Sequence, residues 1–370
     1  MSAYSERSSG QALADFWQDN AQVLSIAAFF AMCVLVFSAG TDTFLTAGNL
    51  LNVIRQAAPL LVVATAMTFV ITTGGIDLSV GSQVALINAL AAMALAAGLP
   101  WPLVVVAMLV IGAAVGLAQG WFVAYQGIPA FIVTLAGLSI LRGFALYLTE
   151  GYSIPIPRIE AFYFIGRGTV LGIPFPALVA IVIAIGGIIV LTRSLYGRRV
   201  VAVGSNAEAA RRVGMPSRRI IASVYMLTGA LSAVAGITIA ARLGSGSSNA
   251  AVGFELEVIA AVVLGGTSLF GGRGTMIGTV LGALTIAVIG NGLILMHISP
   301  FFTQIVTGGI ILLAVWLNSR LFAANARLFR ARAGRAAGTS GTARTPARSG
   351  AAEASAAGGT ATEGGDTRVR

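Results

Sequence analysis

Long apolar runs, separated by short polar or glycine- and proline-containing segments, form the main pattern of this chain. A helix needs about 20 mostly apolar residues to cross a bilayer. Prolines that punctuate these runs, such as Pro59, Pro100, Pro129 and Pro174, are typical of sites where helices begin or turn. Ten runs follow one another, at 22–39, 57–73, 80–98, 102–124, 129–149, 173–192, 220–241, 255–266, 275–295 and 300–318. The pattern predicts an all-α, polytopic integral membrane protein with about ten transmembrane helices.

The run 255–266 is the weakest of the ten predicted spans. As a helix it reaches only about 18 Å, which is shorter than a bilayer core. It therefore suggests a broken helix that neighbouring backbone extends. An arrangement of eight crossings, in which two short segments are re-entrant, keeps the same parity, and both counts stay open.

Small residues recur at helical spacing inside several runs. Gly112 and Gly116 are four residues apart, and so are Gly278 and Gly282. Such spacing lets two helix backbones approach closely in lipid, where apolar contact by itself gives little drive for association. We expect close helix crossings at both places.

Composition agrees with a membrane protein and argues against most classes of enzyme. Hydrophobic residues make up 57% of the 370 residues and charged residues 10%, against about 25% charged in ordinary globular proteins. All 23 basic residues are arginines, which excludes the lysine of a Walker A phosphate loop and lysine Schiff-base chemistry. The only cysteine, Cys33, cannot form an internal disulfide, and the only histidine, His297, cannot anchor a histidine-rich metal site. We expect no catalytic residues, no metal and no cofactor, with Cys33 a small apolar residue and His297 in a short loop.

The formal net charge of +10 is concentrated in two clusters. Residues 193–219 contain seven arginines and one acid, and residues 320–370 contain nine arginines and three acids. Both clusters adjoin apolar runs, so the positive-inside rule explains them better than nucleic-acid binding does. We therefore place both clusters in the cytoplasm and expect no nucleic-acid partner.

These assignments fix the predicted organisation. A cytoplasmic N-terminus, 1–21, lacks the basic start and cleavage site of a secretory signal, so the first run stays as an anchor. A transmembrane domain, 22–319, contains the cytoplasmic loop 193–219 and places the loop 150–172 outside. The arginine-rich cytoplasmic tail, 320–370, is poor in large apolar side chains and is predicted to be disordered from about residue 333. Both termini are then cytoplasmic.

Two glycine-pair turns resemble each other and join consecutive apolar runs. Segment 74–81 contains Gly74, Gly75, Asp77 and Ser79, and segment 265–272 contains Gly265, Gly266 and Ser268. Asp77 and Ser79 suit the capping of a following helix. The turns are interpreted either as broken-helix elements beside a translocation path or as ordinary helical hairpins, and spacing alone leaves both open.

The loop 193–219 contains a predicted short helix. Asn206 is its expected N-cap, the residues from Ala207 to Arg212 are good helix formers, and Gly214 with Pro216 ends it. Such a helix is unstable alone, so it needs a docking surface on this protein or on a partner. The small face of Ala209 and Ala210 fits a groove, and Glu208 and Arg211 are free to pair with surface charges. A simple linker is the alternative.

Four motifs in order resemble the membrane permease of ribose/xylose-type bacterial ABC sugar importers. They are "GGIDLSVGS" at 74–82, "IPAFIVTLAG" at 128–137, "VGSNAEAARRVGM" at 203–215 and "ELEVIAAVVLGGTSLFGGRGT" at 255–275. The similarity covers residues 45–318, and the arginine-rich tail is outside it.

The resemblance implies a homodimeric permease in the bacterial inner membrane that carries a pentose or hexose. It implies a cytoplasmic ATPase subunit and a periplasmic or lipid-anchored sugar-binding protein as partners, with ATP chemistry on another chain. It assigns ATPase coupling to the segment 204–214. The coupling residues are Gly204, Asn206, Glu208, Ala209, Ala210, Arg211 and Gly214.

Polar side chains inside the apolar runs are the remaining candidates for a translocation path. They are Gln83, Asn88, Gln119, Thr134, Ser139, Arg142, Asn291, Thr303 and Gln304. Asn88 and Asn291 are placed with the glycine-pair turns as path candidates, although interhelical bonding is the commoner role of such a residue. Arg142 is expected to extend to the membrane interface.

Two other transport classes remain as alternatives. One is a related ABC permease for nucleosides or branched-chain amino acids. The other is an ATP-independent secondary carrier, which requires an intramembrane acid. Asp77 is the only acid between Asp42 and Glu150, and its predicted position is a turn rather than the middle of a helix.

Overall fold

The computed structural model describes residues 21–299 and the isolated positions 302, 305, 306, 308, 309 and 312. All of them belong to one unit, Met1–Arg320. The predicted N-terminal segment, most of the run 300–318 and the tail 320–370 lie outside the described residues.

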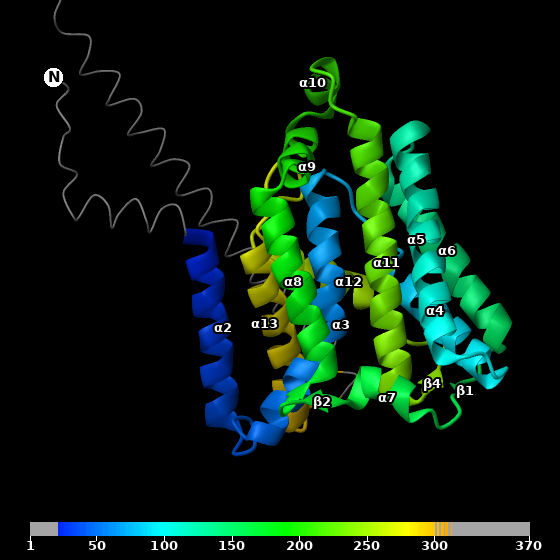
Figure 1. Ribbon diagram of the computed structural model, residues 1–370. Helices are drawn as coiled ribbons and strands as arrows, with labels where there is room; N and C mark the ends of the chain where they lie inside the picture. Colours follow the sequence, from blue (N-terminus) through cyan, green and yellow to red (C-terminus); the bar gives the residue numbers. More distant parts are fainter. Residues whose placement is uncertain (1–20, 300–301, 303–304, 307, 310–311, 313–370) are drawn as a thin grey trace, which may run out of the picture. The chain divides into compact units, whose positions relative to one another are not determined.

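The described chain is mainly helical, as the apolar runs predict. The helices are α2 (Ala21–Gly40), α3 (Ala47–Thr72), α4 (Val80–Ala96), α5 (Trp101–Tyr125), α6 (Ala130–Thr149), α7 (Glu160–Arg167), α8 (Phe175–Arg193), α9 (Leu195–Ser205), α10 (Ala207–Arg212), α11 (Ser217–Leu243), α12 (Phe254–Leu264) and α13 (Met276–Leu295). Figure 1 shows the long helices running side by side.

Four strands of two residues each depart from the all-α expectation. β1 (Ile154–Pro155) pairs antiparallel with β4 (Ser245–Gly246), and β2 (Thr169–Val170) pairs with β3 (Ile173–Pro174). The β1–β4 pair ties the loop that follows α6 to the loop that follows α11. These short pairings satisfy backbone groups at one end of the helices.

Seven described helices are long and apolar enough to cross a membrane: α2, α3, α5, α6, α8, α11 and α13. Helix α4 is apolar but has 17 residues. Helix α12 has 11 residues, so the expectation that the run 255–266 is short for a span is confirmed. The number of crossings therefore depends on how α4 and α12 are extended by their flanking backbone.

Burial separates central helices from peripheral ones. In α3, 83% of the apolar window is buried, against 17% in α6 and 22% in α5. The peripheral helices expose large apolar side chains such as Val110, Phe144 and Val182. Exposed apolar faces of this kind are expected where lipid is the solvent. The helices α3, α4 and α11 form the interior, which is why polar groups on them are removed from the lipid.

Glycine permits the closest helix crossings. Helix α11 packs most extensively against α5. A Cβ atom on Gly112 would lie 2.6 Å from the carbonyl oxygen of Gly229, and a Cβ on Gly116 would overlap the carbonyl of Tyr225. Gly282 approaches Ala261 of α12 in the same way. The close crossings expected from the spacing of small residues are confirmed.

The loops that were predicted to lie on opposite sides of the membrane are at opposite ends of the helices. Figure 1 shows α9 and α10 at one end, and α7 with the short strands at the other. Helix α8 ends at Arg193 and α9 begins two residues later. We call these two ends the α10 end and the α7 end.

Candidate functional site

The loop 193–219 has the local structure that its sequence predicts. The Asn206 side chain accepts a hydrogen bond from Ala209 N at 2.9 Å and caps α10. Gly214 has a φ of 82°, a left-handed conformation that glycine adopts without strain. The helix Ala207–Arg212 and both of its ends are therefore as predicted.

Ala209 and Ala210 lie on different sides of α10, so they do not form a single exposed face. Ala210 is 5% exposed and belongs to the protein's own core, whereas Ala209 is exposed. The Ala210 carbonyl also accepts a hydrogen bond from Met215 N at 3.0 Å. The outward surface of α10 consists of Ala209 and its exposed neighbours, including Val213, which is 74% exposed.

The charged residues of α10 pair with each other. Arg211 lies 3.0 Å from the Glu208 carboxylate, and Arg212 lies 3.3 Å from it. The hydrogen bond from Arg211, with that from Arg212, holds the pKa of the Glu208 carboxyl below its ordinary value. Because all three side chains are exposed, these pairs stabilise the helix only slightly. They order the outer surface of α10 instead of reaching another part of the described chain.

Gly204 anchors the loop to the membrane domain. It is the penultimate residue of α9, and a Cβ on it would overlap the Thr72 carbonyl and lie 2.7 Å from Gly272 N. Gly272 N donates a hydrogen bond to the same Thr72 oxygen at 2.9 Å. Three segments distant in the sequence thus meet at the base of the loop 193–219, and only glycine fits at position 204.

The two glycine-pair turns contact each other at this base. A Cβ on Gly271 would lie 2.7 Å from Gly204 O and 3.0 Å from Gly74 N. Gly74 and Gly266 both have positive φ, 83° and 89°. The second turn also holds Ser268, whose hydroxyl accepts from Phe270 N at 3.3 Å, while Phe270 itself is 96% exposed. The two turns that resemble each other in sequence therefore meet beside the end of α9.

The first turn continues into the interior of the helices. Asp77 and Ser79 are fully buried, and Asp77 Oδ1 accepts from Ser79 N at 2.9 Å and from Ser79 Oγ at 2.7 Å. Asp77 therefore forms a turn just before α4. The N-cap residue is Ser79, whose side chain makes no capping hydrogen bond, so the expected side-chain capping of α4 is not observed. Gln119 of α5 lies 3.0 Å from Ser79 Oγ. Gly75 packs against the hydroxyl of Tyr225.

Asp77 is at a turn, as predicted, and that turn is buried between helices. Its Oδ2 atom is buried and has no hydrogen-bond partner among the described residues. Thr134 donates to Ile76 O at 3.2 Å, so α6 also holds this turn. The short segment 73–79 therefore connects the junction at Gly204 with the polar centre of the helices.

Other polar candidates hold the helices together. Gln83 donates to Gly112 O at 2.8 Å. Asn88 accepts from Ser247 N at 2.7 Å and donates to Gly236 O at 3.4 Å. Ser139 is exposed on α6, and Thr303 and Gln304 lie outside the described residues. The bonds from Gln83 to Gly112 and from Asn88 to Gly236 are interhelical, whereas Ser247 lies in the loop after β4.

Arg142 is held by backbone carbonyls, a role that its sequence position did not predict. Its guanidinium donates to Ser248 O at 2.5 Å, Ala250 O at 3.0 Å and Ala251 O at 3.4 Å. Arg142 thus stabilises the irregular segment between β4 and α12. Sequence periodicity misses this role because the acceptors are backbone carbonyls more than 100 residues away. His297 lies in the turn after α13 and Cys33 is buried among apolar residues, both as expected.

A cavity of about 840 Å³ opens among α3, α11, α12 and α13. Its polar lining includes Gln56, Arg242, Asn249, Glu257 and Asn291. It lies at the α7 end, because Arg167 of α7 donates to the Arg242 carbonyl at 2.7 Å. Sequence reasoning singled out only Asn291 of this set. Arg242 and Glu257 are charged residues at the edges of apolar runs, and this position is the sequence feature that could have identified them.

Asn291 is bonded to a second asparagine at the cavity. Its amide donates to Asn49 Oδ1 at 3.0 Å, and the Asn49 amide donates to Asn291 Oδ1 at 3.0 Å. This reciprocal pair joins the start of α3 to α13. Asn291 therefore lines the cavity while using its amide in an interhelical contact.

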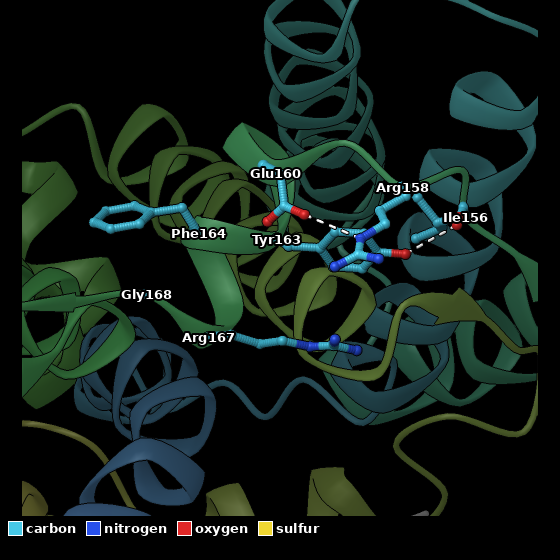
Figure 2. A pocket seen from close by; sticks show the side chains of 7 residues that line it. All are labelled: Ile156, Arg158, Glu160, Tyr163, Phe164, Arg167 and Gly168. Carbon is cyan, nitrogen blue, oxygen red and sulfur yellow. Dashed lines mark hydrogen bonds and ion pairs between the residues drawn. The ribbon is translucent and has the colours of Figure 1, made fainter.

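Figure 2 shows a second cavity, of about 440 Å³, formed around α7. Its polar groups are already partnered: Arg158 pairs with Glu160 at 3.0 Å, and Tyr163 donates to Ile156 O at 2.9 Å. The Arg167 guanidinium lies 4.7 Å from the centre of the Tyr163 ring. Because these groups satisfy one another, this cavity is the weaker candidate for a ligand site.

The apolar helices, buried polar contacts and glycine crossings define a multi-pass membrane protein. The family model described as "Branched-chain amino acid transport system / permease component" matches residues 49–315. The chain belongs to this family of ABC transporter permeases.

Curated relatives cover most of the chain. A probable ABC transporter permease protein, YphD of Escherichia coli K12, is 41% identical over 78% of this chain and 86% of its own length. The xylose transport system permease protein XylH of the same strain is 34% identical over 81% and 92%. The ribose import permease protein RbsC of Haemophilus influenzae is 40% identical over 79% and 92%. No solved structure matches the chain.

Proposed function

We propose that this chain is the permease subunit of an ABC importer that carries a monosaccharide, a pentose or hexose, across the bacterial inner membrane. The observation that carries the proposal is its similarity to permeases named for xylose and ribose transport, at 34% and 40% identity over most of both chains. Energy comes from a separate ATPase subunit, because this chain has no lysine for a phosphate loop.

The proposed arrangement places the α10 end in the cytoplasm and the α7 end outside. The seven arginines of 193–219 lie at the α10 end, in accord with the positive-inside rule. With α4, α12 and the run 300–318 each counted as a crossing, ten spans result and both termini are cytoplasmic. In this arrangement α4 and α12 are shorter crossings extended by the irregular segments 73–79 and 265–275.

The assembly that we propose contains two copies of the permease, two ATPase subunits and an external sugar-binding protein. Helix α10 docks on the ATPase through Ala209 and the exposed residues beside it. The junction at Gly204 transmits movement of α10 to the turn 73–79, and from there to α4. The interior alternates between openings to the two sides, as an importer requires.

Branched-chain amino acids are the second candidate cargo, because the family model carries that description. The relatives named for xylose and ribose favour the sugar. A secondary carrier is the least favoured alternative, since the relatives above are ABC permeases.

Vesicle uptake tests the function. Purified permease is reconstituted with its ATPase and binding protein, and entry of radiolabelled D-ribose and D-xylose is measured with ATP on the ATPase side. Uptake that requires ATP and both partners is expected. Uptake by the permease alone, driven by an ion gradient, would show that it is a secondary carrier.

The docking assignment is tested by comparing Ala209→Glu with Ala210→Glu. Ala209→Glu places a charge in a desolvated interface, at a cost of at least a few kcal/mol if the charge is unpaired. We expect normal abundance with loss of ATPase co-purification and uptake, whereas Ala209→Ser stays near wild type. Ala210→Glu instead buries a charge in the permease core and lowers its abundance. Normal uptake by Ala209→Glu would mean that this face of α10 does not dock.

A further inference from the structure

The larger cavity, at the α7 end, combines both signs of charge with amides and an apolar wall. Arg242 lies in the last turn of α11, and Glu257 lies in the first turn of α12. Gln56 and Asn249 add amide donors and acceptors. Leu60, Phe254 and Ile286 supply apolar surface. Its volume of about 840 Å³ falls in the range of small-molecule sites, about 300–1,000 Å³.

Within the described residues, the side chains of Arg242 and Glu257 have neither a hydrogen bond nor an ion pair. The charged neighbour that acts on Arg242 is another cation, Arg55, and the one that acts on Glu257 is another acid, Glu255. Arg55 and Glu255 do not themselves line the cavity.

Glu257 is exposed and Arg242 is half-buried, so both side chains are accessible to a ligand that enters the cavity. The smaller cavity of Figure 2 shows the opposite design, in which Arg158 and Glu160 pair with each other. Unpartnered polar groups that surround a cavity are characteristic of ligand sites, where the ligand supplies the missing partners.

The lining selects for a ligand that both donates and accepts hydrogen bonds and carries no net charge. A guanidinium only donates and a carboxylate only accepts, while each amide does both. An anion attracted by Arg242 is repelled by Glu257, and a cation meets the reverse. Sugar hydroxyls satisfy both groups, and the carbon-bound hydrogens of a sugar ring fit the wall of Leu60, Phe254 and Ile286. A zwitterionic amino acid would also pair with both charges, so the choice of a sugar rests on the proposed function.

We propose that this cavity is a reception site for a neutral polyhydroxylated sugar on the permease itself, with Arg242 donating to one hydroxyl and Glu257 accepting from another. The inference rests on the proposed function for its cargo and adds that the membrane subunit selects cargo. Binding is weak, since a transport path must release what it accepts.

Equilibrium dialysis of the purified full-length permease, without partner proteins, tests this site. The probes are radiolabelled D-ribose and D-xylose. We expect saturable binding of at least one of them with a Kd in the millimolar range. Glu257→Gln and Arg242→Met each raise that Kd about tenfold, the effect of one lost charge-assisted hydrogen bond. Gln56→Ala, on an exposed residue, is the milder variant and raises it about threefold.

The matched control is Glu160→Gln, which makes the same chemical change at the same end of the protein but outside this cavity. It is expected to bind sugar as the wild type does. The site is disproved if the wild type binds neither sugar, or if folded Glu257→Gln, Arg242→Met and Gln56→Ala all bind as tightly as Glu160→Gln.

Vesicle uptake separates this inference from the proposed function. If the complete assembly imports sugar with ATP while the permease alone binds none, the reception site is wrong and the function stands. If the permease binds sugar through Arg242 and Glu257 but ATP drives no uptake, the site stands and the importer assignment is wrong.

Discussion

The contacts at Gly204 predict the effect of one substitution, because a single added methyl group would clash with neighbouring backbone atoms. In Gly204→Ala the new Cβ overlaps the Thr72 carbonyl and approaches Gly272 N to 2.7 Å. Both neighbours are backbone atoms, so no side chain can rotate away. The three segments must therefore move apart at the base of the loop 193–219.

The cost follows from the contacts. Overpacking of this kind costs about 1–3 kcal/mol. Separation of Thr72 from Gly272 weakens their 2.9 Å hydrogen bond, which adds about 1 kcal/mol. Alanine is the better helix former by about 1 kcal/mol, and this offsets the second cost. A net cost of about 2 kcal/mol corresponds to roughly a thirtyfold decrease in the population with the loop seated on the membrane domain.

We expect Gly204→Ala to reach the membrane and to lose most ATP-dependent uptake, because α10 is no longer held at a fixed position above Thr72. Uptake in vesicles, ATPase co-purification and the melting temperature of the detergent-solubilised permease are measured together. Gly186→Ala is the matched control, since a Cβ at Gly186 in α8 meets nothing within 4 Å. Wild-type uptake and melting by Gly204→Ala would refute the junction.

Two further substitutions test contacts that hold the membrane domain together. Gly116→Val is expected to lower the melting temperature, at a cost of about 1–3 kcal/mol, because its Cβ overlaps the Tyr225 carbonyl and lies 3.1 Å from Gly229 Cα. Gly143→Val is the control, since a Cβ at Gly143 has no atom within 4 Å. Equal melting temperatures of the two variants would contradict the close α5–α11 crossing. Arg142→Gln removes the donors to Ser248 O and Ala250 O and is expected to make the segment 247–253 sensitive to protease added at the α7 end, at a cost of about 1.5–3 kcal/mol. The exposed Arg158→Gln is its control, and equal protection of both variants would mean that Arg142 does not hold the segment.

The sequence alone determined the features that depend on local pattern. Apolar runs follow from side-chain hydropathy, and nine of the ten predicted runs coincide with described helices; the tenth, 300–318, lies mostly outside the described residues. Asn206 and Gly214 were predictable ends of α10, because a cap and a left-handed glycine act within a few residues. The motifs also identified the family, since their order along the chain needs no three-dimensional information.

Only the tertiary structure decided which groups meet across distant segments. Helical spacing does not show that Ala210 turns inward while Ala209 turns outward, because that depends on what lies beneath α10. The partners of Arg142 are carbonyls of a segment without side-chain pattern. The cavity with Arg242 and Glu257 arises where the ends of separate helices converge. Periodicity describes one helix at a time, whereas these contacts depend on how the helices pack against one another.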